Sequence, residues 1–501
     1  MTIVGDARSG PAETDSVNGH GVELAPGRLF IGGSWQPAAD GRTEEIADPA
    51  TGRTLTTVAS AGAQDVDRAV DAARAAFDGG TWSGMTPRQR AKILFRAADL
   101  LRSRADEFAR LESLDVGKPL MFTSTVDIPT VIDTFEYYAS LAAGIEGATR
   151  ATTMPTLAYT RKEPIGVVGA ITPFNFPAIL SATKLAPALA AGNTIVHKPA
   201  QETPLSALRF AELLAEAGVP EGVYNLLTGD GGVGAALVEH RGVDKIAFTG
   251  SSATGRKVAA TAAATLKQVT VELGGKGANI IFADADIEAA INTAIAAFVF
   301  NTGQFCMSGS RLLVERPVYE TVVGALGGAA PHIPVGDPFA EGTVVGPMAG
   351  PQHLGKVRSF VDAATATPGV RVLGGGAPAG RAGYFHTPTV LADVEQSSRF
   401  VQNEIFGPVV TVQPFDTEPE AIRLANGTAY GLSAGLQTKD VSRAHRVAAR
   451  LEAGIVWVNG WSLLDPAMPF GGVGQSGYGR ENGPEGLQTY LRTKSVIVNL
   501  A

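Results

Sequence analysis

The sequence predicts an α/β protein built on a mostly parallel β-sheet with helices on both faces. Between residues 166 and 273, short aliphatic segments typical of strands alternate with longer helical segments, and repeated βα units of this kind form parallel sheets. Glycine, hydroxyl, lysine and carboxylate residues follow these strands. In such sheets, ligands bind outside the carboxyl ends of the strands.

The elements before the sheet are a short hairpin and three helices. Residues 29–35, followed by Asp40-Gly-Arg42, indicate a strand, a turn and a return strand. Apolar residues at helical spacing predict helices over residues 63–77, 87–114 and 127–141. The segment 151–162 is polar and β-prone and has no helical spacing.

The sheet itself is predicted from five strands and the four helices that connect them. The strands are expected over residues 166–172, 194–198, 223–227, 245–249 and 268–273, and the helices over residues 176–191, 204–217, 233–240 and 253–266. The chain ends in another β-prone run at residues 495–500.

Composition and charge exclude several classes of partner. The 501 residues are 45% hydrophobic, which is enough for several buried cores, and the formal net charge is −8. With no dense run of Lys or Arg, nucleic acid is not an expected partner. No apolar run approaches the ~20 residues that a membrane span requires, and the N-terminus lacks a leader pattern, so we expect a cytoplasmic protein without membrane association. Residues 1–25 are expected to be poorly ordered.

The chain contains a single cysteine, Cys306. One cysteine cannot form an internal disulfide, a CxxC redox pair or a thiolate zinc site. The remaining possibilities are a buried apolar residue, a surface thiol or a nucleophile. Gly303 upstream suggests a positive φ or a close approach, and the polar neighbours Gln304 and Ser308 argue against a purely apolar setting.

Two glycine-rich segments follow predicted strands. Residues 229–234 match GxGxxG literally, but no acidic residue ends the next strand, because Asp244 precedes it. That segment is either a pyrophosphate loop or a glycine turn near a ligand. In residues 248–257, Gly250, Ser251 and Gly255 could form an anion site at a helix N-terminus, or an ordinary turn with a serine cap. It is not a Walker A loop, because the lysine and hydroxyl of that motif are absent.

Three polar residues at strand ends have both structural and functional interpretations. Lys198 could reach ribose or phosphate, or could be a solvated lysine. Asn175 could cap a helix, or could donate its amide to an oxyanion. Glu272 could be a surface carboxylate, or a partly desolvated base with a raised pKa.

Seven segments, taken together and in this order, resemble the NAD(P)-dependent, non-phosphorylating aldehyde dehydrogenase superfamily. They are TPFNFP, HKPAQETP, FTGSSATG, VELGGK, GQFC, EIFGPV and PFGG, and they span residues 172–472. The resemblance covers the chain from about Arg28 onward. It implies a Rossmann-like cofactor domain over residues 26–145 and 165–274, a second α/β catalytic domain over residues 275–485, and a small bridging β element for oligomerisation over residues 146–164 and 486–501.

The same resemblance implies roles for individual residues and no metal. Cys306 would be the nucleophile and Glu272 the general base, with the Asn175 side chain and the Cys306 N–H as the oxyanion hole. The implied cofactor-binding residues are Lys198, Gln201, Gly250, Ser251, Gly255, Glu404 and Phe406. The implied substrate pocket is apolar or aromatic and consists of Phe176, Leu180, Phe305, Met307, Trp461, Leu463, Leu464 and Phe470, several of which could instead be core residues.

Departures from the family pattern refine the expected reaction. Where NAD-preferring relatives often carry Glu, three places after Lys198, this chain has Gln201, which predicts use of both NAD and NADP, although adjacent Glu202 could partly substitute. The presence of Glu272 favours hydrolysis to the free acid over transfer to coenzyme A. Thr183 stands where relatives acting on succinic semialdehyde place an arginine. We therefore expect an apolar aliphatic or aromatic aldehyde, accepted broadly.

The tail and residues 150–163 resemble strands that pair across subunits in the family, which predicts a homodimer or homotetramer. Two rival functions stay open from sequence. One is a cysteine hydrolase without redox chemistry, and the other is a non-catalytic protein that retains the fold. The first leaves the EIFGP motif without a purpose, and the second would be expected to have lost Cys306, Glu272 or Asn175.

Overall fold

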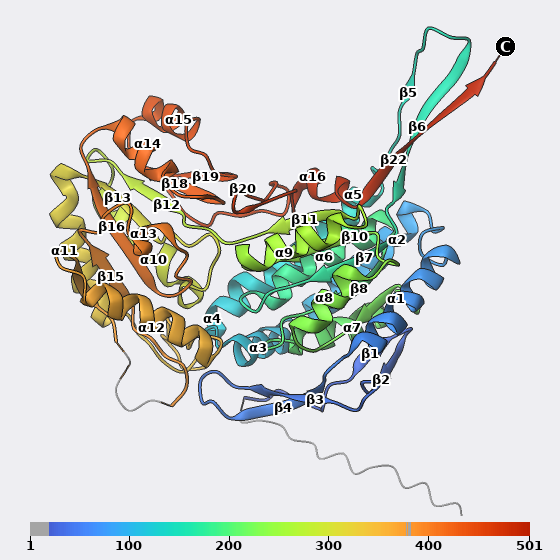
Figure 1. Cartoon of the computed structure of the whole chain (residues 1–501), viewed down its shortest axis with the longest axis horizontal. Helices are drawn as coiled ribbons and strands as arrows, with labels where there is room; N and C mark the ends of the chain where they lie inside the picture. Colours follow the sequence, from blue (N-terminus) through green and yellow to red (C-terminus); the bar gives the residue numbers. More distant parts are fainter. Residues whose placement is uncertain (1–19, 377, 379–381, 501) are drawn as a thin grey trace, which may run out of the picture.

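The computed structural model of the chain describes residues 20–376, 378 and 382–500. Two α/β units lie beside each other, and a three-stranded arm projects from one of them (Figure 1). Of the segment 1–25 that the sequence predicts to be poorly ordered, residues 1–19 lie outside the described residues. For residues 20–25 the prediction is wrong, because Val22 and Leu24 are buried against the apolar side chains of Ile46 and Val58.

The first unit contains an eight-stranded sheet in the order β2-β1-β9-β8-β7-β10-β11-β21. Its central strands β9, β8, β7, β10 and β11 are parallel, whereas β1 pairs antiparallel with β9, β2 with β1, and β21 with β11. This is the doubly wound order, in which the connection reverses direction between β7 and β10. The strand bounds are β1 (Leu29–Ile31), β2 (Ser34–Gln36), β7 (Val167–Ile171), β8 (Thr194–Lys198), β9 (Tyr224–Leu226), β10 (Lys245–Thr249), β11 (Gln268–Glu272) and β21 (Gly477–Tyr478).

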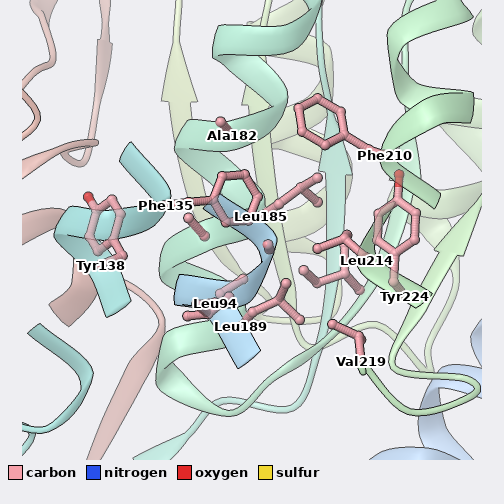
Figure 2. Packing of buried hydrophobic residues seen from close by; sticks show 14 of the residues in the cluster. Leu94, Phe135, Tyr138, Ala182, Leu185, Leu189, Phe210, Leu214, Val219 and Tyr224 are labelled. Atoms are coloured by element: carbon pink, nitrogen blue, oxygen red, sulfur yellow. The ribbon is translucent and has the colours of Figure 1, made fainter. Parts of the chain in front are cut away.

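Helices cover both faces of this sheet, as the βα alternation predicts. On β7, Val168 and Ala170 pack into one core and Val167 and Ile171 into the other, because successive strand residues point to opposite faces. The first core is formed with α2 (Pro87–Ser103), α5 (Ile128–Ala142), α6 (Pro177–Ala191) and α7 (Leu205–Ala217), and Figure 2 shows its close packing. The second core is formed with α1 (Ala63–Asp78), α8 (Gly231–Glu239) and α9 (Ser252–Ala263).

Two predicted elements differ from the structure. The hairpin turns at Gly32-Gly33, with φ of 61° and 87°, because consecutive glycines adopt the positive φ of a tight turn; the return strand is therefore β2, and β3 (Thr43–Ala47) pairs separately with β4 (Thr54–Ala59). The helix predicted over 87–114 is two helices, α2 and α3 (Ala105–Val116). They are separated at Arg104, whose φ of −113° and ψ of 20° leave the helical region.

A short α4 (Leu120–Phe122) and a π-helix, η1 (Thr123–Asp127), precede α5. The helical segment that the sequence predicts from residue 127 therefore begins earlier, at Leu120. Every helix in the described ranges is too short or too polar to span a lipid bilayer.

The second unit contains a seven-stranded sheet in the order β14-β15-β16-β13-β12-β18-β19, parallel except for β14. Its strands are β12 (Ala278–Ile281), β13 (Arg311–Glu315), β14 (Arg371–Gly374), β15 (Thr389–Ala392), β16 (Val409–Phe415), β18 (Ser433–Gln437) and β19 (Ile455–Val458). Its helices are α10 (Ile287–Val299), α11 (Tyr319–Ala329), α12 (Pro351–Thr365), α13 (Arg399–Gln402), α14 (Glu418–Asn426) and α15 (Val441–Ala448), with short turns η2 (Phe300–Gly303), η3 (Arg316–Val318) and η4 (Ala330–His332).

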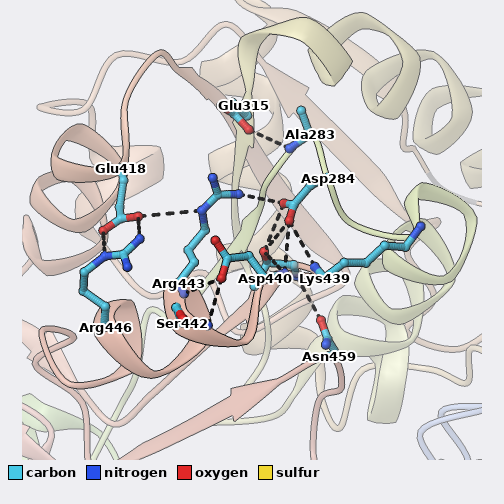
Figure 3. A network of polar contacts seen from close by, with 11 residues as sticks. Ala283, Asp284, Glu315, Glu418, Lys439, Asp440, Ser442, Arg443, Arg446 and Asn459 are labelled. Atoms are coloured by element: carbon cyan, nitrogen blue, oxygen red, sulfur yellow. Dashed lines mark hydrogen bonds and ion pairs between the residues drawn. The ribbon is translucent and has the colours of Figure 1, made fainter.

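A polar network ties together the loops that follow β12 and β18 (Figure 3). Asp284 accepts hydrogen bonds from Thr438 Oγ1 at 3.0 Å and from Arg443 Nη1 at 2.7 Å. Arg443 also pairs with Glu418, which binds Arg446 through two bonds of 2.7 Å. These contacts link the loops and helices that follow the strands at the carboxyl edge of the second sheet.

The arm consists of β5 (Thr149–Arg150), β6 (Thr156–Pro164) and β22 (Leu491–Asn499). β22 pairs antiparallel with β6 from Leu491↔Pro164 to Asn499↔Thr156. The predicted end of the catalytic domain at residue 485 differs from the structure, because β21 is already an edge strand of the first sheet and α16 (Gly483–Gln488) follows it. The strands β17 (Tyr430–Gly431) and β20 (Val473–Gly474) form a separate small antiparallel pair.

Candidate active site

The two sheets present opposite ends to a common site. In the first sheet, Lys198 and Glu272 end β8 and β11. In the second sheet, the segments containing Cys306 and Glu404 precede β13 and β16. The chain passes from the carboxyl end of β11 to the amino end of β12 in five residues, so this short linker joins the two edges.

The linker packs tightly against both sides. A Cβ added at Gly275 would lie 2.2 Å from the carbonyl oxygen of Cys306, and one at Gly274 would lie 2.4 Å from Glu404 Oε2. Because real side chains do not tolerate such separations, only glycine allows the thiol loop and the Glu404 loop to approach the linker.

The loop before Cys306 has a strained backbone. Asn301, Thr302 and Gly303 have φ of 50°, 58° and 68° in succession, a left-handed conformation that is costly for residues other than glycine. Gly303 also needs the absence of a side chain, because its Cβ would lie 2.1 Å from the carbonyl oxygen of Gly407. The close approach suggested by the sequence at Gly303 is therefore observed.

Asn175 lies against this loop. Its Nδ2 donates to the carbonyl oxygen of Gln304 at 2.9 Å, and Asn301 Nδ2 donates to the carbonyl oxygen of Asn175 at 2.7 Å. A carboxamide nitrogen has two hydrogens, so Asn175 keeps one N–H for another acceptor. Among the described residues, no oxygen accepts a hydrogen bond from the Cys306 backbone N–H. Two donors are thus available beside the sulfur.

The Cys306 thiol is partly exposed to an internal cavity and is otherwise enclosed by protein. Burial raises the pKa of the thiol to about 12, and the negative charges of Glu404 and Glu272 act in the same direction. The backbone N–H groups of Met307 and Cys306 oppose this increase without overcoming it. At neutral pH the resting sulfur is therefore protonated and needs a base to become a nucleophile.

Glu272 is 2% exposed, and neither carboxylate oxygen has a partner of normal hydrogen-bond geometry in the described structure. Burial raises the pKa of Glu272 well above its usual value, and the negative charge of Glu481 raises it further. Lys184 and Arg480 lower it by a smaller amount. A buried carboxyl group without partners is the setting expected of a general base.

The sequence prediction missed a buried ion pair beside Glu272. Lys184 Nζ donates to Glu481 Oε1 at 2.5 Å and to Thr249 Oγ1 at 2.6 Å. Thr183 Oγ1 donates to the second oxygen of Glu481 at 3.3 Å. The detectable signal was Lys184 itself, because a charged residue inside an otherwise apolar helix needs a buried partner.

The residues predicted to hold the nicotinamide end lie at the Cys306 side of the site. Glu404 Oε1 accepts the backbone N–H of Gly275 at 2.9 Å, and burial raises the pKa of its carboxyl group. Phe406 has φ of 65°, and His353 shares a 2.6 Å hydrogen bond with its carbonyl oxygen. Its ring packs edge-on against Phe174 at 5.8 Å. Both residues are thus held by contacts with neighbouring protein groups.

The residues predicted to hold the rest of a dinucleotide line the carboxyl edge of the first sheet. Ser251 caps α9 by accepting from Thr254 N at 3.2 Å, so other N–H groups of the first turn stay free for an anion. A Cβ at Gly255 would lie 2.2 Å from the Leu273 side chain, and one at Gly250 would lie 2.6 Å from the Phe248 ring. The two glycines therefore allow the turn and the first part of α9 to pack closely against these side chains.

Lys198 is 6% exposed, and burial lowers the pKa of its ammonium group. Gln201 is exposed three residues later. Residues 229–234 span the turn into α8, where Asp230 caps the helix by accepting from Gly232 N at 2.7 Å. A donor set of lysine, hydroxyl and helix N–H groups along one edge fits a dinucleotide phosphate and ribose.

A cavity of about 550 Å³ leads to the thiol, which is within the range of small-molecule sites. Every residue predicted for the substrate pocket lines it: Phe176, Leu180, Phe305, Met307, Trp461, Leu463, Leu464 and Phe470. Trp461 is fixed by a hydrogen bond from Nε1 to the Met307 carbonyl at 2.9 Å. Thr183, Asp133, Asp465 and Glu481 also line the cavity, and no Lys, Arg or His does so among the described residues.

Comparisons with known proteins agree with this architecture. The model described as the aldehyde dehydrogenase family matches residues 35–496. DhaS of Bacillus subtilis (strain 168) is 45% identical over 474 residues, which cover 94% of this chain and 96% of DhaS. The NAD+ complex of an aldehyde dehydrogenase from Bacillus cereus is 44% identical with a TM-score of 0.93, covering 95% of this chain and 97% of that one. Betaine aldehyde dehydrogenase from Staphylococcus aureus in complex with NAD+ is 40% identical with a TM-score of 0.93, covering 94% of each chain. These matches confirm the resemblance that the seven sequence motifs indicated.

Proposed function

This chain belongs to the aldehyde dehydrogenase family, and we propose that it oxidises an apolar aliphatic or aromatic aldehyde to the free carboxylic acid, with NAD or NADP as the hydride acceptor. One observation carries the proposal. The Cys306 thiol lines a largely apolar cavity, an amide with a free N–H lies against the thiol loop, and a buried carboxyl group without partners is near enough for its charge to raise the pKa of the thiol.

The first half of the reaction uses the thiol and the two donors. Cys306 loses its proton to Glu272, directly or through a water molecule, as its sulfur adds to the aldehyde carbon. The oxygen that becomes negative accepts hydrogen bonds from Asn175 Nδ2 and the Cys306 N–H. When bound, NAD or NADP would supply the hydride acceptor, and loss of a hydride from the carbon attached to the Cys306 sulfur would leave a thioester on that residue.

The second half of the reaction uses Glu272 again. Once the proton taken from Cys306 has passed to solvent, the Glu272 carboxylate takes a proton from a water molecule that attacks the thioester, and the acid leaves as the Cys306 sulfur is released. The raised pKa of Glu272 supports this role, because a carboxylate that binds a proton more tightly is a stronger base. A chain with this base in place favours hydrolysis over transfer of the acyl group to coenzyme A.

The cavity lining supports an apolar aldehyde. Phe176, Phe305, Trp461 and Phe470 surround the space beside the sulfur, and Thr183 offers no charge to a substrate carboxylate. Since apolar pockets discriminate weakly between homologues that differ by a methylene, we expect broad acceptance. A negatively charged substrate would be repelled, because the charged side chains in the lining are all carboxylates.

A second substrate class is favoured by a specific observation. Asp133 and Asp465 are exposed at the cavity, and no basic residue among the described ones lines it. Together with aromatic rings, carboxylates suit a cationic group at the far end of an aldehyde. The Staphylococcus aureus relative is a betaine aldehyde dehydrogenase, so this class belongs in the same panel.

Dual use of NAD and NADP is supported by the exposed Gln201. An amide there does not repel a 2'-phosphate, and the nearby buried ammonium of Lys198 attracts one. Comparing kcat/KM for the two cofactors tests the proposal. A preference for NAD above about a thousandfold, equivalent to ~4 kcal/mol, would refute it.

A homo-oligomer is supported by the arm. Leu157, Ile497, Val498 and Leu500 are exposed on its strands at 45%, 62%, 42% and 65%, and exposed apolar strands are usually covered by another chain. Light scattering at micromolar concentration tests this proposal. A monomer under those conditions would contradict it.

The activity is tested by the absorbance of reduced nicotinamide, using aliphatic, aromatic, cationic and carboxylate-bearing aldehydes. We expect turnover with the first two classes and none with Cys306→Ala. Ester cleavage without aldehyde oxidation would favour a non-redox hydrolase. Absence of both activities in folded protein would favour a non-catalytic role.

A further inference from the structure

Lys118 is a fully buried lysine that the reaction described above does not use. It follows α3 in the loop to α4, where Gly117 has φ of 81°, and it is 1% exposed. Its ammonium forms an ion pair with Asp127, the last residue of η1. The same Nζ lies 3.6 Å from the centroid of the Phe176 ring.

Stability alone is a poor explanation for this arrangement. A buried ion pair is often no more stable than well-packed apolar residues of the same volume. Asp127 Oδ1 has no hydrogen-bond partner, although it is buried, so even the pair is incompletely satisfied. We therefore look for a role of this charge in positioning its neighbours, since its contribution to the free energy of folding is small.

The ring beneath the ammonium belongs to the oxyanion segment. Phe176 follows Asn175 directly and is the residue before α6. Its ring also contacts Phe305 at 5.3 Å, next to Cys306, and lines the cavity. A displacement of Phe176 would change the cavity wall and, through the backbone shared with its neighbour, the position of Asn175.

The same segment is held through its backbone by a second buried residue. Glu112 Oε2 accepts the backbone N–H of Ala178, in the first turn of α6, at 3.3 Å. Glu112 is 0% exposed and comes from α3, the helix that leads into the Lys118 loop. The ring and the backbone of residues 175–178 are therefore both fixed by polar groups from one neighbouring segment.

The other partner of Lys118 lies next to a second part of the cavity lining. Asp127 ends the π-helix η1, and its neighbour Val126 lines the cavity. Short π-helical segments are frequent at functional sites, because the extra residue redirects a side chain. The ammonium thus joins the wall at Val126 to the oxyanion segment at Phe176.

We propose that Lys118 is a positioning residue of this enzyme: its ammonium, anchored by Asp127, holds the Phe176 ring and thereby places the Asn175 amide for the oxyanion. This inference rests on the proposed roles of Asn175 and Cys306. A cation held over an aromatic face in a desolvated site has a strong geometric preference, and a displacement of about 1 Å at a reacting group can lower the rate by about a hundredfold.

The test variant is Lys118→Met with Asp127→Asn, which removes both charges and nearly preserves both shapes. We expect kcat/KM for aldehydes to fall by roughly 10- to 100-fold. Hydrolysis of an activated ester, which uses the same thiol and oxyanion donors without cofactor, should fall by a similar factor. The dissociation constant for NAD should stay within about twofold.

A matched control is Lys245→Met. Lys245 is also buried, donates to Thr270 Oγ1 at 2.7 Å and lies 5.0 Å from the Tyr490 ring, but it does not line the cavity. We expect this variant to lose thermal stability while kcat/KM changes less than about threefold. Equal losses of activity in the two variants would attribute the Lys118 effect to general destabilisation and overturn the inference.

A double-mutant cycle with Asn175→Ala gives the decisive result. If Lys118 acts through the Asn175 amide, Asn175→Ala should cost at least about fivefold less in the Lys118→Met/Asp127→Asn background than in the wild type. Independent, multiplying losses would overturn the inference. If the double variant does not fold, Asp127→Asn alone takes its place in the cycle, because it removes the anchor of the ammonium.

The two proposals fail in distinguishable ways. Full turnover by Cys306→Ala would contradict the proposed function whatever Lys118 does. An active wild type with multiplying costs, or unchanged rates in the Lys118 variant, would contradict only the positioning role.

Discussion

Replacing Glu272 with Gln removes the proposed base while keeping the shape of the side chain. The expected consequence follows from the pKa of the Cys306 thiol, which burial raises to about 12. Ionising such a thiol at pH 7.5 costs roughly 6 kcal/mol, because each unit between pKa and pH is worth 1.36 kcal/mol. Removing a neighbouring carboxylate lowers the thiol pKa somewhat, but burial is the larger cause and persists in the variant.

General base catalysis contributes about 10²- to 10⁴-fold, so Glu272→Gln should lose about that much of kcat at pH 7.5. The wild-type rate should fall as the pH drops through the pKa of Glu272, which lies well above the usual value of a carboxyl group. The variant has no such group to protonate. Its rate should instead rise about tenfold per pH unit as hydroxide ionises the thiol.

Two assays separate the effect on the thiol from the effect on turnover. The rate of Cys306 alkylation by iodoacetamide against pH reports the thiolate, and absorbance of reduced nicotinamide reports turnover. Glu404→Gln is the matched control, because Glu404 also lies near the thiol but its carboxylate is engaged by the Gly275 N–H. This control should weaken cofactor binding and retain the acidic limb of the pH profile. If Glu272→Gln kept the wild-type rate and the same acidic limb, Glu272 would not be the base.

Three further outcomes are expected. Glu272→Gln should raise the free energy of unfolding by about 1 to 3 kcal/mol at pH 8, and this gain should vanish at pH 4. The reason is that a carboxyl group with a raised folded-state pKa destabilises the folded protein as the pH rises above the unfolded-state pKa of that group. Melting curves at the two pH values check this. Gly275→Ala should lower kcat at least tenfold, since the new Cβ would lie 2.2 Å from the Cys306 carbonyl oxygen, whereas Gly324→Ala, with open space around it, should not; steady-state kinetics of both variants decide. Gln201→Glu should lower kcat/KM for NADP at least tenfold and leave NAD little changed, and equal losses with both cofactors would contradict the charge argument.

The part of the candidate site that lies on the first sheet could be predicted because it follows a general rule of parallel sheets. Lys198, Ser251 and Glu272 each end a strand or begin the helix after it, and the alternating pattern locates those ends in the sequence. The thiol half has no such rule. Cys306 and Glu404 precede strands of the second sheet, and their place in the site was available only from family resemblance.

Long-range polar partners could not be predicted by either route. Lys184 and Glu481 are 297 residues apart in sequence, and Asn175 and Gln304 are 129 apart. No periodicity encodes such pairs, since they depend on how segments far apart in sequence meet in the folded chain. A charged residue in an apolar helix indicates that a partner exists, but it does not say which residue that partner is.

The strained loop at residues 301–303 connects the two units at the candidate site. Asn301 and Thr302 each hold a left-handed backbone that costs about 1 to 3 kcal/mol, and the cost must be offset by surrounding contacts. Asn301 provides them by donating to the carbonyl oxygens of Asn175 at 2.7 Å and Gln304 at 3.1 Å. These bonds link the oxyanion segment of the first unit to the thiol loop of the second. The conformation that is unfavourable for the loop is therefore the one that brings the amide donor and the sulfur to a common site.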